Sequence, residues 1–362
     1  MKKKLALFPV TRVQCALSRH SSLLNGFDVS YLFVPRFWAL DGKDACCLDG
    51  GEVTNRLLHS FDKELLMDID VLFVDYNENI NNMAIYESVI SAAMDACIEI
   101  ILSREIKGKL ESETPNLLLG NNYAIKEKGE KEHLYQICCP VITVLTQGIR
   151  TDQFAVELSL RKHFLESGYR VSQIGSHDAS GFFGFSGIPS FLHESFDAYE
   201  KILKFNHYVK NLAEEESPEL LIIGVPNAIM KYNDEIPLGF GILPSIICTA
   251  VESDLSILCM YYNSYNIKIF KEMRNYFHYH LRSCVNLFAL SNTRISFDNS
   301  SGQDKLDYFD LESVFVMKGI ENILKETENF EFHLFNALNS ESINEACLLA
   351  HSYLTDNADF VR

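Results

Sequence analysis

The chain has 362 residues, of which 47% are hydrophobic and 12% aromatic, so it can form sizeable cores and is not typical of a disordered protein. At this length two domains are expected rather than one. The 49 acidic residues outnumber the 32 basic ones, which gives a formal net charge of −17. Because affinity for nucleic acids rests largely on lysine and arginine, this excess argues against a nucleic acid as partner.

The opening residues, MKKKLALFPVTRVQ, resemble a signal peptide only briefly, because Pro9 and Arg12 end the apolar run. We predict a first strand there instead. No apolar stretch reaches the ~18 residues that span a bilayer, so we expect a soluble, cytoplasmic protein with no membrane as partner. The ten cysteines include no C-x-x-C pattern, which predicts reduced, buried thiols and no structural zinc.

Strands and helices alternate through residues 1–103. Buried strands are expected at 4–8, 29–34, 70–76 and about 98–103, and helical segments near 14–24 and 81–97. This alternation predicts a parallel sheet with helices on its faces, in a Rossmann-like or flavodoxin-like domain. Residues 104–137 then become polar and are predicted to connect this domain to the next.

A second alternating set occupies residues 138–293. Its expected strands are 141–146, 169–174, 219–224 and 254–261, and its expected helices are 152–166, 194–215 and 240–251. The fold class predicted is therefore α/β, with two doubly wound, mostly parallel-sheet domains, the second P-loop-NTPase-like. Residues 294–362 are expected to form a small α+β extension, ending in a helix capped by Ser342 with Glu345 three residues later.

The outline of a phosphate-binding unit appears in residues 144–176, where a strand, a tight turn, a helix and a second strand follow one another. Gly148, Arg150 and Thr151 supply a flexible position, a positive charge and a hydroxyl near the start of the helix. However, Asp152 and Gln153 stand where a P-loop carries glycine and lysine. Two interpretations remain open, a phosphate site that has lost its lysine or a structural turn.

Two further stretches contain candidate residues at the ends of strands. In residues 172–189, Ser176, His177 and Asp178 precede a glycine-rich segment, where a His-Asp pair suits a base and its orienter and the Asp178 carboxylate suits magnesium. The alternative is a surface loop whose phenylalanines pack beneath a lid. Asn227 follows the strand that would supply the acid of a P-loop fold, but this strand ends in Gly224 and offers no acid.

Two other features are weaker. Residues 36–51, RFWALDGKDACCLDGG, contain Lys43 after a glycine but lack the remaining P-loop residues, so a solvated loop is the favoured interpretation. His278 and His280 alternate as on one face of a strand, without a third ligand nearby.

Five segments in order make the chain resemble the peptide maturation system proteins of natural-product and bacteriocin-like gene clusters in anaerobic Gram-positive bacteria. They are RHSSLLNGFDV, WALDGKDACCLDGG, ELSLRKHFLESGYRVSQIGS, EKILKFNHYVKNL and LLIIGVPNAI. The resemblance extends from residue 4 to about residue 295. It implies a Rossmann-type domain joined to a P-loop-type domain, with a Lys-Phe pair at the start of the helix that here is Gln153-Phe154. It implies no defined reaction.

Together these observations predict an accessory or tailoring protein in the maturation of a peptide product, with a degenerate nucleotide pocket for ATP or another nucleotide with magnesium. The residues expected to bind the nucleotide are Gly148, Arg150, Thr151, Asp152, Gln153, Ser176 and Asn227, and the catalytic candidates are His177 and Asp178. The expected partners are a precursor peptide or carrier protein and other maturation enzymes, and a homo-oligomer remains open. The alternative is a non-catalytic scaffold that binds the peptide or carrier.

Overall fold

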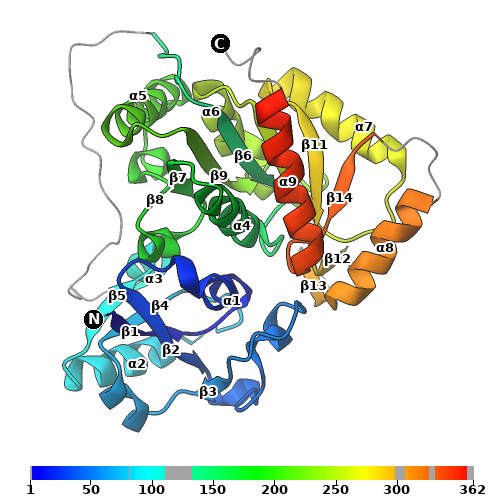
Figure 1. The fold of residues 1–362 in the computed structure, drawn as a ribbon. Helices are drawn as coiled ribbons and strands as arrows, with labels where there is room; N and C mark the ends of the chain where they lie inside the picture. Colours follow the sequence, from blue (N-terminus) through cyan, green and yellow to red (C-terminus); the bar gives the residue numbers. More distant parts are fainter. Residues whose placement is uncertain (1, 81, 111–132, 298–305, 326–330, 357–362) are drawn as a thin grey trace. The chain divides into compact units, whose positions relative to one another are not determined.

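The computed structural model describes residues 2–80, 82–110, 133–297, 306–325 and 331–356 (Figure 1). The chain divides into two compact units. The first comprises Met1–Asn121 together with Asp178–Phe185, and the second comprises Asn122–His177 together with Ser186–Arg362. The fold class is α/β, as predicted, because each unit contains one parallel sheet with helices packed against it.

The first unit has a five-stranded parallel sheet in the order β3-β2-β1-β4-β5. Its strands are β1 (Lys3–Phe8), β2 (Phe27–Val34), β3 (Leu58–Ser60), β4 (Val71–Val74) and β5 (Glu99–Leu102). Its α-helices are α1 (Arg12–Arg19), α2 (Met83–Asp95) and α3 (Arg104–Lys109). The short β3 is a strand that the sequence pattern did not reveal.

The second unit has a seven-stranded parallel sheet in the order β14-β11-β10-β6-β9-β7-β8. Its strands are β6 (Val141–Thr146), β7 (Val171–Gly175), β8 (Ser186–Gly187), β9 (Leu220–Ala228), β10 (Leu255–Met260), β11 (Val285–Leu290) and β14 (His333–Phe335). An antiparallel hairpin, β12 (Thr293–Phe297) and β13 (Leu306–Asp310), lies outside this sheet. Every residue of β6 and β10 is buried, as is typical of strands covered on both faces.

Helices cover both faces of the second sheet (Figure 1). Apolar side chains of α4 (Gln153–Glu166) and α9 (Ser340–Asp356) form the core on one face. The core on the other face contains side chains of α5 (Ala198–Glu216), α6 (Ile242–Ala250), α7 (Ile267–Tyr276) and α8 (Ser313–Lys325). The C-terminal residues are therefore not a separate extension, since β14 is the edge strand of the main sheet and α9 packs beside α4.

Three local expectations differ from the structure. His278 and His280 lie on a π-helical turn, Phe277–Leu281, and not on a strand. Helix α9 begins at Ser340, so Ser342 is inside it, and Asn339 accepts the hydrogen bond from the Ser342 amide at 2.9 Å. The cysteines are all free, but only half of them are buried. Among the described helices, none is long and apolar enough to cross a membrane.

Candidate functional site

The turn between β6 and α4 has two residues with an unusual backbone conformation. Arg150 and Asp152 have φ values of 64° and 61°, in the left-handed region that glycine adopts without strain. Asp152 occupies the position where a P-loop has its glycine. Such residues cost free energy and cluster at functional sites, so the conformation indicates a constraint beyond chain connection.

The inside of this turn is filled by its own hydroxyl groups. The Thr146 hydroxyl accepts from the Gly148 amide at 3.0 Å and lies 2.5 Å from the hydroxyl of Thr151. Thr151 is almost completely buried, so its hydroxyl does not face solvent. A glycine is required at position 148 for packing, because a Cβ atom there would lie 2.3 Å from the Tyr261 hydroxyl. That hydroxyl donates a hydrogen bond to the Ile149 carbonyl.

Both charged side chains of the turn have partners within the second unit. The Arg150 guanidinium donates twice to the Asp310 carboxylate, at 2.9 and 3.0 Å, and lies over the ring of Tyr308. The Asp152 carboxylate accepts from the backbone N–H of Asn292 at 3.1 Å. These contacts fix the turn to the strand ends beside it.

Gln153 bridges two strands of the sheet. Its side-chain amide donates to the carbonyls of Val144 in β6 and Val225 in β9, both at 2.7 Å. Both N–H groups of the amide are thereby used, which leaves no donor on this side chain for a phosphate. The residue that replaces the P-loop lysine is a structural link in this chain.

A buried acid, Glu157, lies one helical turn after Gln153 and was not predicted. The Glu157 carboxylate accepts from the Ser176 amide at 3.1 Å and, weakly, from the Gln173 side chain at 3.5 Å. Its other oxygen, Oε1, has no hydrogen-bond partner. Burial raises the pKa of Glu157 to about 7, against the opposing effect of the Ser176 contacts.

Glu157 packs against the middle of β9 at Gly224, where a Cβ atom would lie 2.2–2.4 Å from the carboxylate. The acid beside Gly224 thus belongs to helix α4 and not to β9. The sequence contained one signal for this acid. Glu157 lies within the apolar run FAVELSL of a βαβ helix, and residues in such a run face the sheet. A perturbed pKa at the carboxyl edge of a parallel sheet is typical of functional sites.

His177 and Asp178 belong to different units. The ring of His177 lies 5.6 Å from that of Phe154 at the start of α4. Asp178 belongs to the first unit, where its carboxylate accepts from the Arg104 amide at 2.7 Å and pairs with the Arg104 guanidinium. Among the described residues, no group of three or more His, Cys, Asp or Glu side chains is arranged to hold a metal ion.

The other expected residues have simpler surroundings. Asn227 is exposed near the end of β9 and has a φ of 67°. In the nearby loop, the Asn233 side chain accepts from the amides of Glu235 and Ile236, as an ordinary turn former does.

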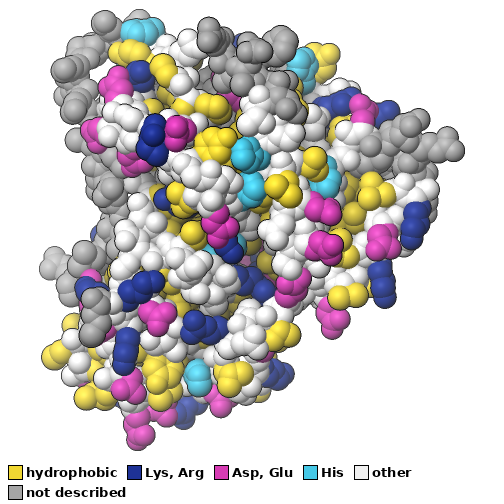
Figure 2. All heavy atoms as spheres, viewed as in Figure 1, with side chains coloured by type: hydrophobic (Ala, Val, Ile, Leu, Met, Phe, Trp, Pro, Cys, Tyr) yellow, Lys and Arg dark blue, Asp and Glu magenta, His cyan; other side chains and the backbone are white. Residues whose placement is uncertain are grey.

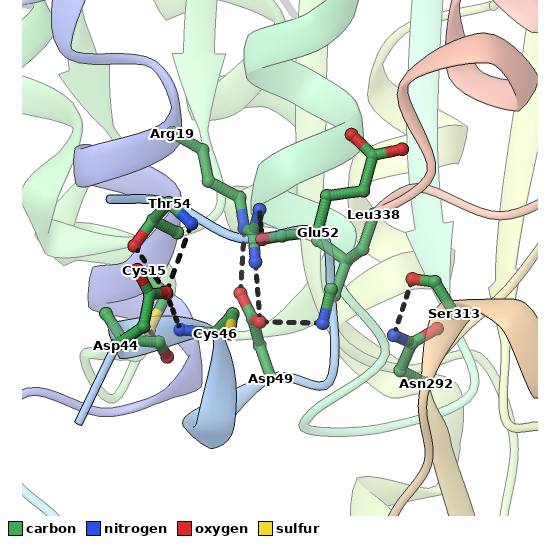
Figure 3. A network of polar contacts seen from close by, with 12 residues as sticks. Cys15, Arg19, Asp44, Cys46, Asp49, Glu52, Thr54, Asn292, Ser313 and Leu338 are labelled. Atoms are coloured by element: carbon green, nitrogen blue, oxygen red, sulfur yellow. Dashed lines mark hydrogen bonds and ion pairs between the residues drawn. The ribbon is translucent and has the colours of Figure 1, made fainter. Parts of the chain in front are cut away.

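The loop 36–51 of the first unit is internally bonded rather than merely solvated (Figure 3). Arg19 of α1 donates to both oxygens of the buried Asp49, at 2.7 and 2.9 Å, and to the Glu52 carbonyl. Asp44 accepts from the amides of Cys46 and Thr54. The loop therefore has a defined structure, and Lys43 has no P-loop environment.

No family model matches the chain, and no curated protein matches its sequence. A DUF1611 family protein from Anabaena variabilis is similar over 98% of this chain and 99% of its own, with a TM-score of 0.60 and 9% identity. A pseudomurein peptide ligase type C from Methanothermus fervidus has a TM-score of 0.27 and 11% identity, over 71% of this chain and 38% of its own. A GTPase from Pyrococcus abyssi has a TM-score of 0.31 and 12% identity, over 60% and 98%. The first similarity shows a shared fold, whereas the other two scores support no argument.

Proposed function

We propose that the chain is an accessory or tailoring protein in the maturation of a peptide product. In this proposal, residues 147–153 form a degenerate phosphate site that binds a nucleotide with magnesium but does not hydrolyse it. The observation that supports it is the turn itself. The turn keeps two left-handed residues at the start of a 14-residue helix, while the side chains that would act on phosphate are bonded inside the protein.

Binding and hydrolysis depend on different groups at such a turn. The amides at the start of α4 and the helix dipole favour an anion whatever the side chains are. Hydrolysis requires in addition a mobile positive charge on the transferred phosphate. Gln153 carries no charge and Arg150 is paired with Asp310, so the turn retains the first property and lacks the second.

Glu157 gives the site a dependence on pH. It lies one helical turn, about 5 Å, from the start of α4. Its pKa of about 7 means that it is neutral in slightly acidic solution and negatively charged in slightly basic solution. An anion at the turn is repelled only by the charged form, so nucleotide affinity should fall as the pH rises through 7.

The role in peptide maturation comes from the resemblance of the five sequence segments described above. The partners proposed on that basis are a precursor peptide or carrier protein and other maturation enzymes. His177 remains the proposed catalytic residue of the second unit, because it interacts electrostatically with Glu157, opposing the rise in pKa that burial causes there. For Asp178, the contact with Arg104 supports an anchoring role in the first unit more than magnesium binding.

A second candidate is a non-catalytic scaffold that binds the peptide or carrier. The internal bonding of the turn favours it, because the Thr146 and Thr151 hydroxyls and the Gly148 amide bond to one another and not to a ligand. The two candidates differ in whether nucleotide binding responds to charge at the turn.

Calorimetric titration of the full chain with ATP and with ADP, each with magnesium, tests the proposal. Gln153→Lys should strengthen binding by roughly 1–3 kcal/mol, the range for a hydrogen bond to a charged group. Ser167→Lys, at the opposite end of α4, adds the same charge as a matched control and should leave affinity unchanged. None of the three proteins should hydrolyse ATP at an enzymatic rate.

If Gln153→Lys leaves binding undetectable while the far-UV spectrum and the melting temperature are retained, the scaffold becomes the preferred function. Equal effects of the two lysine variants would also contradict a specific site at the turn.

A further inference from the structure

A pocket of about 880 Å³ lies at the opposite edge of the second sheet from the turn 147–153. It is bounded by residues 134–139, by the end of α6 and its connection to β10 (residues 248–254), and by Arg282. These segments precede β6, β10 and β11, which are neighbours in the sheet and start at this edge. The volume is in the upper part of the range of roughly 300–1,000 Å³ found for ligand pockets.

The two main walls of the pocket are held at a fixed spacing by Asn206 of α5. The Asn206 side chain accepts from the Tyr135 amide at 2.7 Å and donates to the Tyr135 carbonyl at 2.9 Å. The same side chain donates to the Ala250 carbonyl at 2.8 Å. Because Asn206 is buried and bonded to both walls, the pocket is formed before a ligand arrives, which lowers the cost of ordering on binding.

Hydroxyl groups form part of the lining. Ser253 faces the pocket and lies 3.0–3.1 Å from the hydroxyls of Ser256 and Ser283, which are themselves buried. Hydroxyls can rotate to donate or accept, so this cluster adapts to a polar ligand.

The thiols of the lining are unreactive. Burial raises the pKa of Cys139 to about 11 and that of Cys248 to about 12. Both therefore remain protonated near neutral pH and contribute apolar surface rather than a nucleophile or a metal ligand.

Charges of both signs line the pocket without neutralising each other. Arg282 and Glu252 are exposed, and neither forms an ion pair with any residue in the described part of the chain. Asp254 uses one oxygen to accept from the Val141 amide at 2.7 Å. An arginine and two carboxylates in one pocket complement a ligand that has an anionic and a cationic group.

We propose that this pocket binds a short peptide whose two ends are free. Arg282 receives the terminal carboxylate, Glu252 and Asp254 receive an ammonium group, and the apolar lining of Ile137, Val141 and Val251 takes a side chain. The amino edge of the sheet is then a peptide-binding site separate from the phosphate site at the carboxyl edge. The inference builds on the proposed role in peptide maturation and identifies where the peptide binds.

The probe is the tripeptide Leu-Ala-Lys with free ends, titrated calorimetrically into the full chain. It should bind, and amidation of its carboxylate should weaken binding by about 10- to 100-fold, the effect of losing one hydrogen bond between charged groups. Arg282→Gln should weaken the free peptide to the same extent but leave the amide unchanged. Arg294→Gln removes an exposed arginine of β12 instead and should leave affinity unchanged.

A second comparison peptide is acetylated and has norleucine in place of lysine, so it has no ammonium group. The wild type should bind Leu-Ala-Lys more tightly than this peptide, and Glu252→Gln should reduce that difference in affinity. No binding of the tripeptide at millimolar concentration, or equal losses for Arg282→Gln and Arg294→Gln, would overturn the proposal. Arg282→Gln should bind nucleotide with the same affinity as the wild type, because Arg282 belongs to the peptide site and not to the phosphate site. Unchanged peptide binding in a protein that binds no nucleotide refutes only the phosphate site, and the reverse result refutes only the peptide site.

Discussion

At the level of single residues, the turn at the carboxyl ends of the second sheet's strands differs from a P-loop at two positions, 153 and 157. A P-loop has a lysine at the start of its helix, whereas this chain has the neutral Gln153 there and the acid Glu157 one turn later. Gln153 bonds β6 to β9, and Glu157 fills the space beside Gly224. The chain therefore has no positive charge at position 153 and has an acid with a pKa of about 7 at position 157.

Glu157 should make stability depend on pH. Its pKa is raised from the ordinary value of 4.5 to about 7 in the folded chain, so between these values the unfolded state loses its proton first and stability falls as the pH rises. Below pH 4.5 the contribution is fully present, and above pH 7 roughly 3 kcal/mol is lost. Urea unfolding from pH 4.5 to 8 should show this decrease in the wild type and not in Glu157→Gln. A Glu341→Gln control, on the exposed start of α9, should retain the wild-type decrease, and parallel curves for all three would contradict the assignment.

The sequence could predict the position of the turn but not the direction of its side chains. The apolar strand 141–146 and the helix after it fixed where residues 147–153 would lie. The partners of Arg150 and Asp152, however, are Asp310 and Asn292, which are more than 100 residues away in the chain. Because such contacts depend on the order of strands in the sheet, no local pattern indicates them.

At the level of elements, helix α4 and strand β9 approach each other closely where Glu157 contacts Gly224. Gly224→Ala would place a methyl group in the position of the Glu157 carboxylate and should destabilise the second unit by roughly 1–3 kcal/mol, as overpacking does. In a Glu157→Ala background the same substitution should cost much less, because the obstacle has been removed. A double-mutant cycle of urea unfolding measures this coupling. Additive effects would show that the two residues do not meet.

Most strands were predictable because they are buried on both faces and so appear as continuous apolar runs. Two elements of the first unit escaped prediction, β3 with three residues and α3 with six, since both are too short for a clear periodicity. Helix α3 lies at the start of residues 104–137, which were predicted to be a connection only. The C-terminal residues were predicted as elements but not as part of the sheet. Strand β14 pairs with β11 across an intervening hairpin and α8, and nothing in the local pattern of residues 333–335 specifies that pairing.

At the level of the whole molecule, the chain contributes a segment from the middle of its second unit to the first. In Asp178–Phe185, the ring of Phe182 lies 5.1 Å from Phe27 and 5.2 Å from Phe73, and its carbonyl accepts from the Asn25 amide. Phe182, Phe183 and Phe185 are all buried, so packing accounts for the phenylalanines of this segment. Acidic and basic side chains are interspersed on the face shown in Figure 2, so the net negative charge is not gathered there in one field.

Phe182→Ala should destabilise the first unit by roughly 3–5 kcal/mol, since it empties a buried position in its core. Hydrogen exchange should accelerate in β1 and β4 more than in β6 and β10. Phe309→Ala removes an exposed ring of β13 and serves as the control. Faster exchange confined to the second unit after Phe182→Ala would contradict the division of the chain.

The most direct test of the account is the pH dependence of ATP binding with magnesium, measured by calorimetry from pH 5.5 to 8 in the wild type and in Glu157→Gln. We predict that the wild-type affinity falls roughly tenfold across this range, in excess of any change in the variant, because a charge appears about one helical turn from the bound phosphate. The variant undergoes the same protonation of the ligand, so the difference isolates Glu157. Identical pH profiles for the two proteins, or no binding by either, would contradict a phosphate site governed by this acid.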